Sequence, residues 1–138
     1  MDRATLENNI KKVFESDGDV LFAYLFGSHV TGLAHDFSDI DVACYVKPGD
    51  TTYYLEKEKK ISTELSITLH SDKIDLCLLN VAPIVLKFNI ITDGEVIISR
   101  DEQARIDFET DVLYKYFDFK PYLDEYHRLL KDKIRRVS

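Results

Sequence analysis

Two aspartates, Asp39 and Asp41, stand two residues apart at the start of an apolar run, residues 39–47. Side chains alternate between the two faces of a β-strand, so this spacing predicts that both carboxylates lie on one face. Neighbouring carboxylates repel each other unless a cation lies between them, and hard oxygen ligands suit a Mg²⁺ ion that bridges to a phosphate. The pair therefore predicts a metal site for phosphoryl chemistry.

A glycine and a serine, Gly27 and Ser28, directly follow the apolar run 20–26, and ten residues separate them from Asp39. Glycine lets the backbone approach a ligand closely, and the following N–H groups and the Ser28 hydroxyl can hold phosphate oxygens. Each feature by itself is common in ordinary turns. The combination of a buried strand, Gly-Ser and a paired aspartate favours a nucleotide site.

Asp75 is a third candidate acid, within the short apolar run 73–79. A neighbouring strand could place it beside Asp39 and Asp41. Three carboxylates around two Mg²⁺ ions can hold a triphosphate and lower the pKa of an attacking hydroxyl, with Asp75 as a ligand of the second ion or as the base. Alternatively, Asp75 is an edge-strand acid that faces water.

Periodic and continuous apolar patterns predict the elements that must position these residues. Apolar residues at helical spacing predict helices over 3–15 and 52–69. Further helices are expected over 83–93, from a capping box at Ser99 and Glu102 to about residue 117, and from Pro121 onward. Continuous apolar runs predict strands at 20–26, 39–47, 73–79 and 95–99. This order predicts a small sheet covered by helices, in the α/β or α+β class, within a single domain 1–138.

Composition narrows the classes of function. The formal net charge of −7 argues against independent binding to nucleic acid. No apolar run is long enough to span a membrane, and residues 1–10 lack the apolar core of a signal peptide. Cys44 and Cys77 lack a metal-binding spacing, so they are predicted to be buried, reduced thiols of a cytoplasmic protein.

The C-terminal region is rich in aromatic residues. Half or more of them are predicted to lie in the core of the last two helices, and the alternative is a surface that binds a partner. These residues are Tyr114, Tyr116, Phe117, Phe119, Tyr122 and Tyr126. The basic tail 131–136 is predicted to be a solvated helix end rather than an RNA contact.

Gly27-Ser28, ten residues and then Asp39-Ile40-Asp41 resemble the GS-x10-D-x-D pattern of the DNA polymerase β-like nucleotidyltransferases. Within this superfamily, the chain resembles the minimal nucleotidyltransferase (MNT) branch. Segments 73–83, 91–94 and 116–122 resemble the later blocks of the MntA antitoxins, so the resemblance covers essentially the whole chain.

This resemblance implies a nucleotidyltransferase fold and a protein adenylyltransferase, the antitoxin of a HEPN/MNT (type VII) toxin–antitoxin pair. Such an enzyme uses ATP and Mg²⁺ to transfer AMP to a tyrosine of its cognate HEPN ribonuclease toxin. Carried over by position, Gly27, Ser28 and His29 would bind the nucleotide. Asp39, Asp41 and Asp75 would be catalytic and would bind the metal ions. Many relatives carry arginine after the Gly-Ser, where this chain has residues 29–31, His-Val-Thr.

Two other functions are compatible with the same residues. The protein could neutralise its partner by direct binding, with a vestigial site, and its acidic balance suits a basic ribonuclease. It could also transfer a nucleotide to a small molecule, although residues 82–138 offer little room for a separate substrate-binding region.

Overall fold

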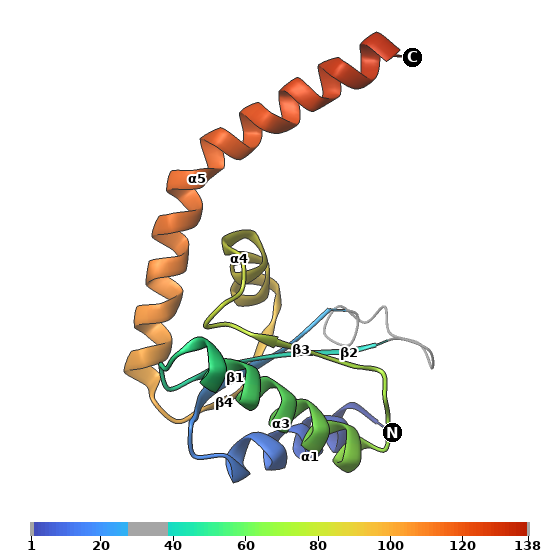
Figure 1. The fold of residues 1–138 in the computed structure, drawn as a ribbon, viewed down its shortest axis with the longest axis vertical. Coiled ribbons are helices and arrows are strands. Elements are labelled where there is room, and N and C mark those ends of the chain that lie inside the picture. Colours follow the sequence, from blue (N-terminus) through green and yellow to red (C-terminus); the bar gives the residue numbers. More distant parts are fainter. Residues whose placement is uncertain (1, 28–38, 138) are drawn as a thin grey trace.

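The computed structural model describes residues 2–27 and 39–137 (Figure 1). The predicted sites Ser28 and His29 lie outside these residues. The elements in chain order are α1 (Arg3–Ser16), β1 (Val20–Phe26), β2 (Ile40–Val46), α3 (Thr51–Leu69), β3 (Ile74–Leu78), α4 (Ile84–Asp93), β4 (Glu95–Ser99) and α5 (Glu102–Val137). The four predicted strands are all present, with β2 and β3 one residue shorter at each end than expected.

The strands form one mixed sheet in the order β3-β2-β1-β4. β1 runs antiparallel to β2 and to β4, whereas β2 and β3 are parallel. Helices α1 and α3 cover one face, and α4 with the first part of α5 covers the other (Figure 1). The expected small mixed sheet flanked by helices is confirmed.

Local sequence signals explain where the helices begin. Asp2 caps α1 by accepting a hydrogen bond from the Thr5 N–H at 2.7 Å, and Asp50 caps α3 through the Tyr53 N–H at 2.9 Å. Each helix turns one apolar stripe toward the sheet. The buried residues of these stripes are Leu6, Ile10, Val13 and Phe14 in α1 and Ile61, Leu65 and Leu69 in α3. The spacing of four predicted for α3 therefore defines its buried face.

A buried ion-pair network joins α1, β1 and α3. Asp17 is only 4% exposed, and the Lys57 ammonium lies 3.0 Å from its Oδ1 and 2.7 Å from Asp19 Oδ2. Burial raises the pKa of Asp17, but the hydrogen bond from the Asp19 N–H and the charge of Lys57 outweigh it and leave that pKa below its usual value. Because the folded-state pKa is lowered, this group stabilises the fold above its unfolded pKa, and the contribution is lost as the pH falls through the folded pKa.

Lys57→Met is expected to lower the free energy of unfolding by about 2–3 kcal/mol, because it leaves a buried carboxylate without its main partner. Urea denaturation at pH 7 measures this loss. Lys60→Met is the matched control, since Lys60 Nζ contacts the same carboxylate at 3.5 Å but its side chain is 53% exposed. We expect that control to change stability little. Equal losses in both variants would contradict the role assigned to Lys57.

The prediction of two C-terminal helices is wrong: α5 is one helix of 36 residues with Pro121 inside it. Proline lacks the N–H that would bond one turn back, and its ring crowds the preceding turn, so it commonly kinks a helix. In Figure 1 α5 bends partway along, and its second part leaves the body of the protein. The helix continues on both sides of Pro121, so the residue lies within α5 instead of ending it.

The start of α5 also differs from the predicted capping box. The helix begins at Glu102, and Asp101 caps it by accepting a hydrogen bond from the Ala104 N–H at 3.0 Å. The Ser99 hydroxyl instead bonds the Glu102 carboxylate at 2.6 Å. Asp is as good an N-cap as Ser. Because Asp101 lies two residues after Ser99, the helix begins two residues later than predicted.

The prediction that half or more of the C-terminal aromatic residues form core is also wrong. Val112 is the buried residue of α5 among those described. Tyr116 stacks on Phe88 of α4 with ring centroids 3.6 Å apart. The other five aromatic residues of the cluster are exposed: Tyr114, Phe117, Phe119, Tyr122 and Tyr126. Two physical reasons apply. Tyr114 lies on the side of α5 that faces away from the sheet, and the later part of α5 extends past the sheet and α4, where no described element covers its side chains.

Both cysteines are free thiols, as predicted. Cys44 is buried in the central strand β2, but Cys77 is only half-buried because β3 is an edge strand, so the expectation of burial is wrong for Cys77. Burial, with a smaller contribution from the charge of Asp75, raises the pKa of Cys77 to about 11. Within the described residues, no helix combines the length and apolar character needed to cross a membrane.

Candidate active site

Asp41 and Asp75 are direct partners across the parallel pair β2–β3. Val42 and Leu76, their respective neighbours, pack into the core under α1 and α3, so alternation places both carboxylates on the opposite face. Adjacent strands lie about 4.8 Å apart. The parallel pairing therefore makes neighbours of two acids that are thirty-four residues apart in the sequence.

Gly27 lies beside Asp41 where β1 ends. Its φ of +76° is in the left-handed region that favours glycine. A Cβ at this position would overlap Asp41 Oδ2 and lie 3.1 Å from Asp41 Cγ. Gly27 is thus required for the backbone turn and for the space that the Asp41 carboxylate occupies. Its predicted contact with phosphate remains a prediction.

Asp39 stands immediately before β2 and is exposed. The next residue, Ile40, donates its N–H to the Lys73 carbonyl at 2.8 Å, which extends the β2–β3 pairing toward Asp39. The three predicted acids thus come from the same end of two neighbouring strands, and their catalytic role stays a prediction.

Asp75 lies on the edge strand β3 and is exposed. The alternative that it is an edge-strand acid facing water is therefore confirmed, whereas its role as a metal ligand or base stays a prediction. An exposed carboxylate has no burial cost to offset. It is also accessible to a substrate.

The donor set can be compared with what Mg²⁺ requires. Among residues 2–27 and 39–137, no three or more His, Cys, Asp or Glu side chains are grouped closely enough to hold a metal ion. Mg²⁺, however, commonly binds through one or two carboxylates and completes its shell with water and substrate phosphates. The neighbouring carboxylates of Asp41 and Asp75 fit that mode of binding.

Two apolar features beside the acids were missed from the sequence. Phe26 pairs with Asp41 across β1–β2, and its side chain packs with the core under α4. Gly94, the residue that ends α4, lies close to Phe26. A Cβ at Gly94 would meet the Ile90 carbonyl oxygen at 2.5 Å and Phe26 Cβ at 3.3 Å, so only glycine fits there without a shift. The Asp-Gly at the end of α4 was the available signal, and it indicated a helix end but not this close approach.

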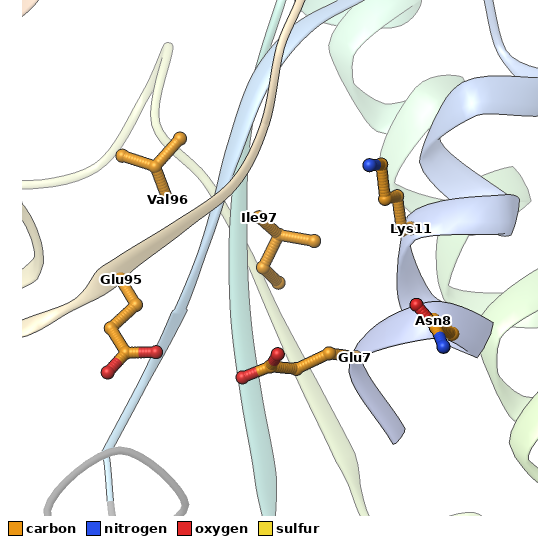
Figure 2. A pocket seen from close by; sticks show the side chains of 6 residues that line it. All are labelled: Glu7, Asn8, Lys11, Glu95, Val96 and Ile97. Carbon is orange, nitrogen blue, oxygen red and sulfur yellow. The ribbon is translucent and has the colours of Figure 1, made fainter. Parts of the chain in front are cut away.

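A separate pocket of about 190 Å³ lies between α1 and β4 (Figure 2). Figure 2 shows the Glu7 and Glu95 side chains near each other, with Lys11 farther along α1. Arg3 donates to both carboxylates and compensates one of their two negative charges. Ile97, which also lines the pocket, packs toward α1 and α3, on the sheet face opposite to Asp41 and Asp75. This pocket is therefore not part of the candidate site.

The fold and the sequence together define a nucleotidyltransferase. Residues 8–103 match the family model described as polymerase beta, nucleotidyltransferase, so the chain belongs to that family. The matched region contains Gly27 and all three predicted acids. The family prediction made from the Gly-Ser and the paired aspartates is confirmed.

Three solved structures that are similar to this chain contain toxin–antitoxin proteins. One is a toxin–antitoxin crystallised with AMP-PNP, 26% identical with a TM-score of 0.70, covering 94% of this chain and 98% of that one. A mutant MntA-HpeT toxin–antitoxin is 25% identical with a TM-score of 0.69 and the same coverage. A tri-AMPylated Shewanella oneidensis HEPN toxin in complex with its MNT antitoxin is 23% identical with a TM-score of 0.65, covering 97% of this chain and 99% of that one, which supports the fold. No curated protein matches the chain.

Proposed function

We propose that this protein is an antitoxin that transfers AMP from ATP to a tyrosine hydroxyl of a cognate HEPN toxin and so neutralises it. The observation that carries the proposal is the direct pairing of Asp41 with Asp75 beside Gly27. Two further findings support it: membership of a nucleotidyltransferase family, and similarity along 94% of the chain to a toxin–antitoxin crystallised with an ATP analogue.

The reaction joins the tyrosine oxygen to the α-phosphorus of ATP and breaks the bond to the β-phosphate, which releases pyrophosphate. Asp39, Asp41 and Asp75 would hold the two Mg²⁺ ions together with phosphate oxygens. Bound Mg²⁺ supplies positive charge that stabilises the developing negative charge on the phosphates and lowers the pKa of the attacking hydroxyl. Alternatively, Asp75, which is exposed at the sheet edge, would be the base that accepts the hydroxyl proton.

The nucleotide would lie at the open end of β1 and β2. Gly27 allows the backbone to pass close to a ligand there, and Ser28 and His29 follow it directly in the sequence. Backbone N–H groups and the Ser28 hydroxyl would bind the triphosphate, and His29 would add a hydrogen bond where many relatives have arginine. The free thiols of Cys44 and Cys77 agree with a cytoplasmic protein, where ATP is plentiful.

Incubation of the purified protein with ATP, Mg²⁺ and its cognate HEPN toxin tests this function. Intact-mass spectrometry should show the toxin gaining one or more AMP masses, and peptide mapping should place them on tyrosine. Chelation of Mg²⁺ with EDTA should abolish the gain.

Two results would contradict the proposal. Loss of toxin ribonuclease activity without a mass change would show neutralisation by direct binding. Nucleotide transfer to a small molecule in the absence of any protein partner, with the toxin left unmodified, would show a different acceptor.

A further inference from the structure

The second part of α5 carries an apolar stripe that no described element covers. Its residues, which we call the distal stripe, are Leu123, Tyr126, Leu130, Ile134 and Val137. They follow one another at intervals of three or four, so they lie on one side of the helix. All except Leu123 are exposed, and Ile134 is 61% exposed. Such spacing is typical of a helix that packs against another helix.

The distal stripe continues a contact surface that is already used. Val112 is buried, and Tyr116 stacks on Phe88 of α4, at the same three- and four-residue spacing. In Figure 1 the second part of α5 leaves the body of the protein, so none of the described elements covers the same side of the helix there. Most of the stability of a protein helix comes from packing of its apolar face, and in residues 122–137 that face is exposed. Packing on a partner would therefore stabilise this part of α5.

The charged residues beside the distal stripe indicate which kind of partner surface is complementary to it. The acids of this segment are paired within the helix, Asp124 with Lys120 at 2.6 Å and Asp132 with Arg128 at 3.4 Å. Glu125 also pairs with Arg128. In contrast, neither Lys131 nor Lys133 has an ion pair within the described residues. The surface beside the distal stripe is therefore positively charged, although the whole chain is acidic.

A second copy of this chain is a poor occupant. Residues 122–137 contain five Lys or Arg and three Asp or Glu, so two copies would bring like net charge together. In a parallel pair, the two Lys133 side chains would also oppose each other beside the apolar seam. The surface is better matched by a different helix whose apolar stripe is flanked by acidic residues.

We propose that the distal stripe of α5 is the docking surface for the toxin, through a toxin helix with an apolar stripe flanked by Asp or Glu. The identity of this partner rests on the proposed function. Docking at α5 holds the toxin independently of nucleotide chemistry, and the reaction at Asp41 and Asp75 follows on the docked toxin. Toxin binding and AMP transfer are therefore separable by mutation.

Leu130→Ala combined with Ile134→Ala tests the apolar contribution, because alanine preserves the helix while removing two exposed side chains. Isothermal titration with unmodified toxin should show binding about 10- to 100-fold weaker than wild type. Tyr114→Ala is the control, since Tyr114 is 72% exposed on the opposite side of α5. Affinity of the double variant within twofold of wild type would overturn the proposal.

A matched pair of substitutions tests the charge contribution. Lys133→Gln and Arg128→Gln each remove one positive charge, the first beside the distal stripe and the second on the opposite side of the helix. Lys133→Gln should weaken toxin binding several-fold and reduce its dependence on salt concentration, whereas Arg128→Gln should change neither. Equal effects of the two substitutions would overturn the assignment of an acidic partner surface.

Two further measurements separate this proposal from the proposed function. Asp41→Asn should bind toxin like wild type but transfer no AMP. If the wild-type protein binds toxin through α5 but transfers no AMP, the proposed function is contradicted and the docking proposal stands. Sedimentation of the protein alone should show a monomer. A dimer that dissociates in the Leu130→Ala, Ile134→Ala variant would identify a second copy as the occupant and overturn the proposal.

Discussion

Asp41→Asn should reduce AMP transfer to the toxin by about 1,000-fold or more, because loss of a metal-binding carboxylate removes several kcal/mol of transition-state stabilisation. Asparagine has nearly the same shape but no negative charge, so it holds a cation between residues 41 and 75 far less well. Initial rates of AMP incorporation at saturating ATP and Mg²⁺ measure the effect. Asp75→Asn should show a loss in the same direction, since Asp75 pairs directly with Asp41.

Asp72→Asn is the matched control for Asp41→Asn, since Asp72 is an exposed acid just before β3 that we assign no catalytic role. It should retain full activity. An Asp41→Asn variant with more than a tenth of wild-type activity would contradict the assigned role.

Gly27→Ala should lower AMP transfer by about 100-fold, because displacement of a reacting group by about 1 Å costs that much. The added Cβ would overlap Asp41 Oδ2, so the carboxylate must move. The φ of +76° also penalises any residue with a Cβ, by about 1–2 kcal/mol. Kinetic assays and urea denaturation should therefore detect separate losses of activity and stability.

Gly18→Ala is the control for Gly27→Ala. A Cβ at Gly18 meets no atom within 4 Å, and the residue does not have a positive φ. Its stability should stay the same or rise slightly, because alanine restricts the unfolded chain more than glycine does. Full activity in Gly27→Ala would show that neither the turn nor the position of Asp41 matters for the reaction.

Much of the fold could be predicted because it depends on local patterns. The stripe Ile61, Leu65 and Leu69 predicted the buried face of α3, and the uninterrupted run 20–26 predicted a central strand. Both signals arise from the periodicity of side chains along a single element, which the sequence contains in full. The Gly-Ser and Asp-x-Asp spacing indicated the nucleotidyltransferase family for the same reason, since all of it lies within fifteen residues.

The wrong predictions about α5 concern the tertiary surroundings of the helix, not its local pattern. Pro121 was expected to begin a helix, but a proline either ends or bends a helix depending on the turns at its two sides. Half or more of the aromatic residues of α5 were expected in a core, yet apolar character alone does not show whether another element is present to cover them.

The sequence by itself determined the four strands, the helices before α5, the family and the identity of the candidate acids, because each follows from residue types at short spacing. Only the tertiary structure decided that β3 lies at the sheet edge and pairs in parallel with β2, which sets Asp75 opposite Asp41. It also decided that Gly27 provides the space for the Asp41 carboxylate and that α5 extends uncovered beyond the sheet. These features depend on contacts between residues far apart in the chain, for which local patterns carry no signal.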